Sequence, residues 1–248
     1  IMISNTYLPA VAVENPVDVY DTGIFNSIGC GYDGSGTVVA VLDTGLDYYH
    51  PAFSTDNFTS DTLGMTFSDV EKFIGDTVAS DKQSGLTASD VYISTKVPYG
   101  FDYADGDADV FPIQSDHGTH VAGTIAAVSN NKKGIVGIAG GDKAKGQKGV
   151  KLMSCQIFVD NPDGTTDQAP GATAIKYGAD NGAVISQNSW GYSFDRNHDG
   201  EVSGDEMKEA LNATISASDK AAVDYFVKYA GCDNKGNQLP GSPMKGGV

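Results

Sequence analysis

One aspartate and two histidines occur in surroundings that could support proton transfer. Asp43 ends the apolar run 38–42 and is followed by Thr44-Gly45, and His117 and His120 lie in a segment made mostly of small residues. An imidazole exchanges protons near neutral pH, and a neighbouring carboxylate can fix its tautomer and stabilise its charged form. If the fold brings Asp43 and His117 together, the pair could act in general acid–base or nucleophilic catalysis.

The spacing of the histidines admits a second kind of chemistry. His117 and His120 are three residues apart, so on a helix they share one face and could form a metal pair. A metal hydrolase built on both histidines and Asp43 is therefore an alternative. It is disfavoured because no glutamate of the helical zinc motif lies between the histidines and no further ligands are evident. The histidines could also be ordinary helix residues, and Asp43 could simply cap a turn.

Residues 195–206 match the twelve-residue calcium-binding loop of EF-hand proteins. The predicted oxygen ligands, with Glu201 acting through its backbone carbonyl, are Asp195, Asn197, Asp199, Glu201 and Glu206. Ser203 stands at loop position 9, where a side chain can act through water. We expect a structural calcium ion here; the alternative is an acidic turn that matches by chance. No entering helix is evident, so the segment is EF-hand-like rather than a complete EF-hand.

Alternating strands and helices are expected to position these residues. Strands buried on both faces are favoured by the apolar runs at 37–43, 152–159 and 183–187. Helices are favoured by small or apolar residues at helical spacing over 118–128, 170–181 and 218–230. This alternation is typical of an α/β fold with a parallel sheet covered by helices. Asp43 would then lie at the carboxyl end of a strand, where open α/β sheets build their sites.

Two polar stretches separate the predicted elements. Residues 53–97 are polar and contain one helix signal, the capping-box spacing of Ser68 and Glu71. We interpret about 54–97 as an insertion rather than as part of the core. Residues 102–116 carry five aspartates and are interpreted as a solvated acidic loop.

Composition and charge exclude several function classes. The 248 residues carry a formal net charge of −16, which would repel a phosphate backbone, so we expect no nucleic-acid partner. No apolar run approaches the roughly 18 residues of a membrane span, so we expect no transmembrane segment. The first basic residue is Lys72, so we expect no signal peptide with a basic leading region. Three cysteines are too few for a disulfide scaffold: Cys30, Cys155 and Cys232.

Three segments follow one another along the chain: Asp43-Thr44-Gly45-Leu46, the residues Ser115–Ala127 around His117, and Asn188-Ser189-Trp190-Gly191. Together and in this order they resemble the signatures of the subtilisin-like serine proteases (subtilases). Residues 96–105 are also similar to the lactocepin-like cell-envelope proteinases of that family. The resemblance implies a three-layer α/β/α architecture with a mostly parallel sheet. It also implies a serine endopeptidase that acts on proteins or peptides and is secreted or associated with the cell envelope.

The resemblance assigns a role to each of these segments. Asp43 would be the triad aspartate and His117 the general base, with His120 structural. Ser189, Trp190 and Gly191 would form the strand edge that pairs with an extended peptide and shapes the primary specificity pocket. A calcium site of the family usually has an acidic residue after the His-Pro that follows Asp-Thr-Gly. In this sequence that position is Ala52, which puts the site in doubt.

The serine nucleophile and the oxyanion asparagine of the family are not evident in the sequence. No G-T-S-M-A-type turn occurs in the sequence. The residues around Ser242 resemble this motif only superficially, and too few residues follow Ser242 to form the helix that the motif begins. Residues 247–248 look like the beginning of the strand that precedes the oxyanion asparagine. We therefore expect residues 1–248 to be the amino-terminal portion of a subtilisin-like domain, with a sheet incomplete on its C-terminal side and a C-terminal fragment as a partner. Alone, this chain is expected to be inactive; the alternative is an inactive subtilase-like module that binds peptide and calcium.

Overall fold

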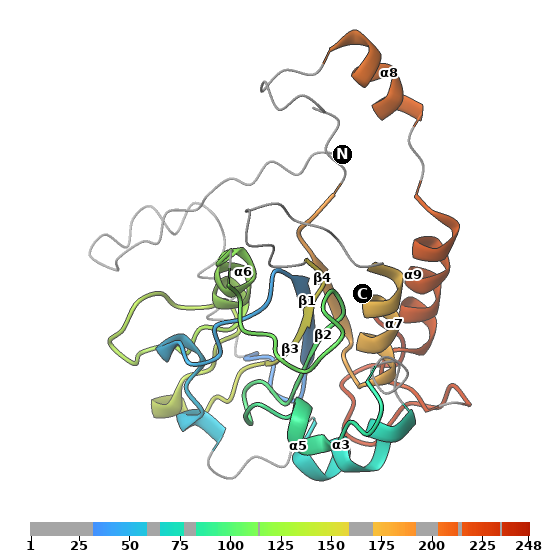
Figure 1. Ribbon diagram of the computed structural model, residues 1–248. Helices are drawn as coiled ribbons and strands as arrows, with labels where there is room; N and C mark the ends of the chain where they lie inside the picture. Colours follow the sequence, from blue (N-terminus) through green and yellow to red (C-terminus); the bar gives the residue numbers. More distant parts are fainter. Residues whose placement is uncertain are drawn as a thin grey trace.

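A computed structural model describes residues 32–58, 65–76, 83–113, 115–158, 171–191, 203–212, 215–233 and 235–248. Within these residues a central sheet is flanked by helices on both sides (Figure 1). The α-helices are α3 (Phe67–Phe73), α5 (Ala88–Val91), α6 (His117–Ala126), α7 (Gly171–Asp180), α8 (Gly204–Asn212) and α9 (Ala217–Tyr229). Short 3-10 turns are η1 (Pro51–Phe53), η2 (Asp56–Phe58), η3 (Ile74–Asp76) and η4 (Lys143–Lys145).

The sheet has four described strands, and all of its pairings are parallel. In the order in which they lie side by side, the strands are β2 (Tyr99–Asp102), β3 (Lys151–Gln156), β1 (Val38–Asp43) and β4 (Ile185–Asn188). Asp43 pairs in register with Gln156, and Leu42 with Asn188. The carboxyl ends of the strands therefore meet at one edge, and Asp43 lies on it. The predicted parallel sheet is confirmed.

Successive residues of a strand point to opposite faces of the sheet, so each strand contributes side chains to the core on both faces. The even-numbered residues 38–42 of β1 pack in one core cluster with Tyr177 of α7 and Phe226 of α9. The odd-numbered residues 39 and 41 pack in a second cluster with Ala122 of α6. Figure 1 shows the same layers, with α6 on one side of the sheet and α7 and α9 on the other. The predicted three-layer α/β/α architecture is thus observed.

The described part of segment 54–97 contributes to the core, contrary to the sequence interpretation. Six of its buried side chains join the cluster on the α7 and α9 side of the sheet: Met65, Val70, Ile74, Leu86, Ala88 and Val91. These residues are spaced too irregularly to show a helical or strand period, so the polar composition around them concealed their role. That the segment is a family-variable insertion stays a prediction.

The capping box of this segment was also misplaced by the sequence reasoning. It is formed by Thr66 and Asp69 rather than by Ser68 and Glu71. Thr66 Oγ1 accepts the Asp69 N–H at 3.3 Å, and Asp69 Oδ2 accepts the Thr66 N–H at 3.0 Å. Because α3 begins at Phe67, only this pair spans the first turn.

Asp102 belongs to the sheet and not to a solvated loop. All four residues of β2 are buried, and the Asp102 side chain accepts the N–H groups of Ala104 and Asp105 at 2.7 and 3.0 Å. Burial raises the pKa of Asp102 to about 7; those N–H bonds oppose the rise, and the charges of Asp105 and Asp107 add to it. The solvated acidic loop thus begins after Asp102, with Asp105, Asp107 and Asp109 exposed.

The last residue of the chain lies along the edge of β4 that faces away from β1. The Val248 N–H donates to Val184 O at 3.0 Å, and the Ser186 N–H donates to Val248 O at 2.9 Å. This alternation is the hydrogen-bond pattern of a parallel pair. It agrees with the strand predicted to begin at 247–248.

No helix within the described residues is both long and apolar enough to cross a bilayer. Cys155 is a buried thiol of β3 and Cys232 is a half-buried free thiol, whereas Cys30 lies outside the described residues.

Candidate active site

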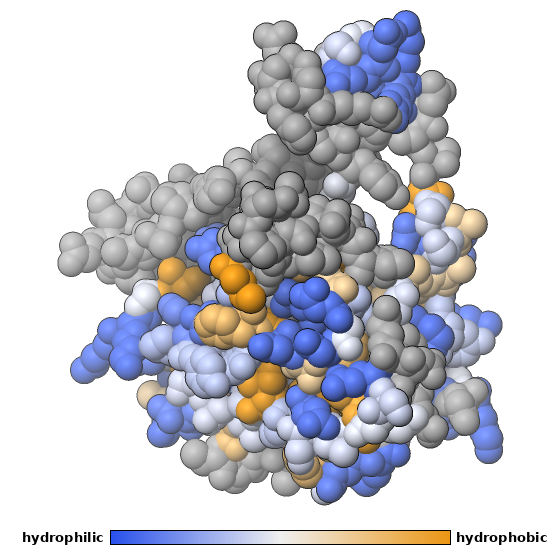
Figure 2. Space-filling view, viewed as in Figure 1, coloured by the Kyte–Doolittle hydropathy of each residue, from blue (hydrophilic) through white to orange (hydrophobic). Residues whose placement is uncertain are grey.

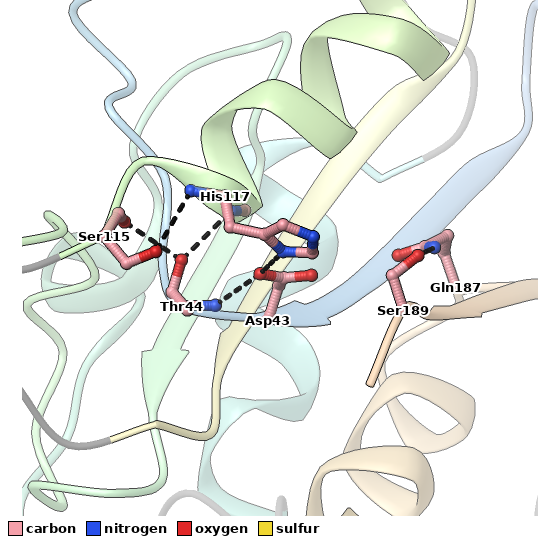
Figure 3. Close-up of polar contacts among 7 residues, drawn as sticks. Asp43, Thr44, Ser115, His117, Gln187 and Ser189 are labelled. Atoms are coloured by element: carbon pink, nitrogen blue, oxygen red, sulfur yellow. Dashed lines mark hydrogen bonds and ion pairs between the residues drawn. The ribbon is translucent and has the colours of Figure 1, made fainter. Parts of the chain in front are cut away.

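Asp43 and His117 meet at the carboxyl edge of the sheet. The Asp43 side chain is 2% exposed, and its Oδ1 lies 2.7 Å from His117 Nδ1 and accepts the Thr44 N–H at 2.8 Å (Figure 3). This contact places a proton on Nδ1, because a carboxylate only accepts hydrogen bonds. In the neutral ring the other nitrogen, Nε2, is then a hydrogen-bond acceptor, and the side chain is 38% exposed. The arrangement can take up a proton from a group that approaches from solvent.

A second set of hydrogen bonds ties the end of β1 to the start of α6. Thr44 Oγ1 accepts the Gly118 N–H at 3.0 Å and donates to Ser115 O at 3.0 Å (Figure 3). One hydroxyl therefore connects the residue after Asp43 with the residues on both sides of His117. The sequence reasoning did not single out Thr44, although it lies within the Asp-Thr-Gly motif.

The close approach of α6 to β1 requires glycine at position 118. A Cβ atom at Gly118 would lie 2.3 Å from Gly45 O and 3.1 Å from Asp43 Cβ. Neither contact can be relieved by a side-chain rotation, because one partner is backbone and the other is a Cβ. The small residues predicted around His117 thus serve to bring the imidazole against the carboxylate.

The contacts of the Asp43 carboxylate with His117 and with the Thr44 N–H use only one of its two oxygens, Oδ1. The buried Oδ2 of Asp43 has no hydrogen-bond partner within the described residues, so the carboxylate keeps one acceptor unused.

The metal alternative finds no support in the described geometry. Within the residues that the structure covers, no group of three or more His, Cys, Asp and Glu side chains could hold a metal ion. His117 uses Nδ1 to contact Asp43, and His120 is an exposed residue of α6.

The predicted substrate strand lies across from the Asp43–His117 pair. Figure 3 shows Ser189 and Gln187, which are joined by a hydrogen bond, on the side of the site opposite His117. Ser189 and Gly191 are exposed. A Cβ atom at Gly171 would lie 2.7 Å from Trp190 Cη2, so the indole rests on the first residue of α7. Residues 189–191 thus present an exposed edge, with the Trp190 ring beside it, across from His117.

Ser242 does not belong to this site. Its Oγ donates to Met244 O at 2.8 Å, and the residue lines a cavity together with Val38 and Gly182. These two residues lie at or just before the amino ends of β1 and β4, so Ser242 is at the edge opposite Asp43.

The predicted calcium ligands fall mostly outside the described residues. Asp195, Asn197, Asp199 and Glu201 are not among them. Glu206 lies in the first turn of α8, which begins at Gly204, and its Oε2 accepts the Ser203 N–H at 2.7 Å. Calcium binding stays a prediction.

Comparison of the sequence with known proteins identifies the family to which the chain belongs. Residues 34–239 match the sequence profile of the Subtilase family. The chain belongs to the subtilase family. This confirms the resemblance that the motifs around Asp43 and His117 predicted. The family is one of serine proteases, which hydrolyse peptide bonds.

Individual relatives match parts of this subtilase chain. The PII-type proteinase of Lactococcus lactis subsp. cremoris is 34% identical over 167 residues, which are 64% of this chain and 8% of that proteinase. The Thermophilic serine proteinase of Bacillus sp. (strain AK1) is 29% identical over 157 residues, 63% of this chain and 26% of that protein. The solved structure of MycP1 with the N-terminal propeptide removed aligns with 86% of this chain and 45% of its own, at 18% identity and a TM-score of 0.45. The subtilase chain thus spans a small part of the length of the curated relatives.

Proposed function

We propose that the complete protein is a subtilisin-type serine endopeptidase in which Asp43 and His117 are two members of an Asp-His-Ser triad. The main support is the 2.7 Å contact between His117 Nδ1 and Asp43 Oδ1 at the carboxyl edge of a parallel sheet. The names of the relatives, a PII-type proteinase and a thermophilic serine proteinase, point to the same reaction.

His117 performs both proton transfers in the proposed reaction. Its Nε2 takes the proton of the serine hydroxyl as the serine oxygen bonds to the carbonyl carbon of the substrate. The same nitrogen donates that proton to the leaving amine as the C–N bond breaks, which leaves an acyl-enzyme. A water molecule then attacks the acyl carbon and gives a proton to His117. This proton returns to the serine oxygen as the ester bond breaks, which releases the carboxylic acid product. Asp43 holds the ring in one tautomer and stabilises the imidazolium in each step.

The substrate is proposed to lie along residues 189–191 as an additional extended strand. The exposed backbone of Ser189 and Gly191 offers hydrogen bonds to a peptide of any sequence. Trp190, held against α7, offers an apolar wall for one substrate side chain.

The nucleophile and the oxyanion asparagine are proposed to come from a C-terminal segment that extends the sheet beyond β4. The pairing of Val248 with residues 184–186 supports this, because it occupies the position of the next parallel strand. Within the described residues, the His117 side chain bonds to Asp43 and to no serine.

Labelling with a fluorophosphonate probe tests the proposal. The product of the complete reading frame should be labelled, and His117→Ala or Asp43→Asn should slow labelling by roughly 10³- to 10⁴-fold. The matched control is His120→Ala, which changes the other histidine of α6 and should leave the rate within a factor of about three. Unchanged labelling of the His117→Ala variant would overturn the triad assignment.

The 248-residue chain by itself should not be labelled, and labelling should return when the C-terminal segment is added. Labelling of this chain alone would contradict the proposed origin of the serine. A complete protein that binds peptides without any labelling would instead identify an inactive subtilase-like module.

We also propose that calcium orders residues 195–206 next to the substrate strand. At a calcium concentration about 100 times the dissociation constant, binding should stabilise the protein by about 2.7 kcal/mol. Asp195→Ala should abolish this gain in a melting experiment. The control is Asp205→Asn, since this side chain is 94% exposed and stands at a loop position that supplies no ligand. Equal melting temperatures in calcium and in chelator would contradict the site.

A secreted or cell-envelope location is proposed as well. It is supported by the acidic composition and by the similarity of residues 96–105 to the lactocepin-like cell-envelope proteinases. Fractionation of the producing cells should find the protein in the medium or wall fraction, and a purely cytosolic pool would contradict it.

A further inference from the structure

Three aromatic side chains form a cluster beside the Asp43–His117 pair. Tyr48 and Tyr49 lie on the segment that follows β1, and Phe111 lies on the segment that follows β2. Ring centroids are 4.6 Å apart for Tyr48 and Tyr49, 5.9 Å for Tyr48 and Phe111, and 6.1 Å for Tyr49 and Phe111. Tyr48 packs against the core cluster on the α6 side of the sheet, whereas Tyr49 is 78% and Phe111 39% exposed. The rings of Tyr49 and Phe111 are therefore accessible to a ligand.

Backbone contacts hold the aromatic cluster close to the catalytic pair. The Leu46 N–H donates to Val110 O at 2.8 Å, which joins the segment after Asp43 to the residue before Phe111. The Asp47 N–H donates to Thr119 Oγ1 at 2.8 Å, which joins the same segment to α6 two residues after His117. The cluster thus has a defined position relative to the base.

The cluster lies toward the sheet edge opposite the substrate strand. Residues 189–191 follow β4, whereas Phe111 follows β2, and these two strands are at opposite ends of the order β2-β3-β1-β4. If the acyl side of the substrate pairs with residues 189–191, as the proposed function has it, a peptide that continues past His117 toward β2 brings the residues of its leaving-group side to the rings.

The two segments that carry the cluster are rich in carboxylates. Residues 43–50 and 102–120 together contain seven aspartates and no lysine or arginine. Asp47 Oδ1 accepts the Tyr49 N–H at 3.1 Å and Asp109 Oδ1 accepts the Phe111 N–H at 3.0 Å, so both carboxylates are fixed at the bases of the rings. Neither has a partner for its second oxygen within the described residues. In the orientation of Figure 1, Figure 2 shows hydrophobic and hydrophilic residues side by side over the region of α6.

The negative potential acts on the rings themselves. Burial, the neighbouring Tyr49 side chain, and the charges of Asp109 and Asp47 raise the pKa of Tyr48 to about 12. A cation placed over these rings would experience the same field with a favourable sign.

We propose that Tyr48, Tyr49 and Phe111, with Asp47 and Asp109, form a subsite for a lysine or arginine side chain on the leaving-group side of the peptide substrate. A basic side chain stacks its cationic head on exposed ring faces and pairs it with a carboxylate. An apolar side chain gains only the ring contact, and an acidic one meets repulsion. The inference rests on the proposed peptidase function and names part of its specificity.

Cleavage of matched peptides by the complete protein tests the subsite. Internally quenched peptides should carry Arg, Leu or Glu at each of the first three positions after the scissile bond and be otherwise identical. At one of these positions kcat/KM should be about 10-fold higher for Arg than for Leu and lower still for Glu. The preference should shrink as the salt concentration rises, because Asp109 is exposed and Asp47 is only half-buried.

Two variants should reduce the preference for Arg over Leu. Tyr49→Leu keeps an apolar surface but removes the ring, and Asp109→Asn keeps the acceptor for the Phe111 N–H but removes the charge. Each should lower kcat/KM for the Arg peptide by about 3- to 10-fold and leave the Leu peptide within about 2-fold. The controls are Tyr32→Leu, a residue 86% exposed before the amino end of β1, and Asp224→Asn on α9.

The outcomes separate this inference from the proposed function. An enzyme that is labelled by the fluorophosphonate probe but cleaves the Arg, Leu and Glu peptides equally overturns the subsite alone. Equal losses on all three peptides in the Tyr49→Leu variant also overturn it, because they show a structural role. If the complete protein is neither labelled nor active, the proposed function fails. Binding of the same peptides is then measured by fluorescence anisotropy. Binding without a preference for the Arg peptide would overturn the subsite as well.

Discussion

Thr44 links the two catalytic candidates, although its side chain has no direct part in proton transfer. Its hydroxyl accepts the Gly118 N–H and donates to Ser115 O, both at 3.0 Å, so it spans the residues on either side of His117. Small displacements of a catalytic base are costly, because proton transfer depends steeply on distance. Thr44 is thus a positioning residue for the Asp43–His117 contact.

Thr44→Val keeps the shape of the side chain and removes both hydrogen bonds. We expect kcat of the complete protein to fall by about 10-fold with little change in KM, and the free energy of unfolding to fall by about 1–3 kcal/mol. Thr44→Ser should restore both values. Steady-state kinetics and urea unfolding are the measurements, with Thr124→Val on the exposed side of α6 as the control. A normal kcat in Thr44→Val would show that the link is dispensable.

At the scale of elements, the site depends on how α6 docks against the end of β1. The two glycines of α6 differ in what surrounds them. A Cβ at Gly118 would lie 2.3 Å from Gly45 O, whereas a Cβ at Gly123 would meet only the end of the Ile135 side chain, at 3.3 Å. The first contact is with rigid backbone and the second is with an atom that can move.

Gly118→Ala should therefore separate α6 from β1, and Gly123→Ala serves as its control within the same helix. The first substitution should lower the free energy of unfolding by about 1–3 kcal/mol and reduce kcat by about 100-fold, because the imidazole moves away from Asp43. The second should be neutral or stabilise the protein by up to about 1 kcal/mol, since alanine favours helix. Similar effects of the two substitutions on kcat would refute the docking argument.

At the scale of the whole molecule, a buried lysine couples folding to pH. The Lys96 side chain is fully buried; its Nζ donates to Val150 O at 2.8 Å and to Gly140 O at 3.3 Å, and it lies 5.4 Å from the centre of the Phe58 ring. Burial lowers the pKa of Lys96 from 10.5 to about 7. Between these pH values the unfolded chain binds the proton that the folded chain has released. The free energy of unfolding must therefore rise with pH across this window, and below pH 7 the cost of the buried charge is present in full.

Replacing the lysine by an apolar side chain removes this dependence. Relative to Lys96→Met, the unsubstituted protein should gain roughly 4 kcal/mol of unfolding free energy between pH 7 and 10.5. Urea unfolding of both proteins at several pH values measures the difference. Lys72→Met, at a side chain that is 72% exposed, should give a curve parallel to that of the unsubstituted protein. A constant difference between Lys96→Met and the unsubstituted protein would contradict the buried titration.

Local patterns in the sequence determined the fold class and singled out Asp43 and His117, which the structure brings into contact. The apolar run before Asp43 and the small residues after His117 each specify a local structure, and strand–helix alternation allows few topologies. Their order along the chain was enough to indicate the subtilase family. These features were predictable because each depends on residues close to one another in the sequence.

The tertiary structure decided what depends on contacts between distant segments. It buried Asp102 at the end of a strand that the polar surroundings had hidden, and it brought side chains such as Val70 and Val91 into the core. It also placed Phe111 against Tyr48 and Tyr49, which are more than 60 residues away in the sequence. The spacing of apolar residues in the sequence does not reveal such contacts. They arise only in the folded sheet, where β1 and β2 lie on either side of β3 and the carboxyl ends of these strands lie at one edge.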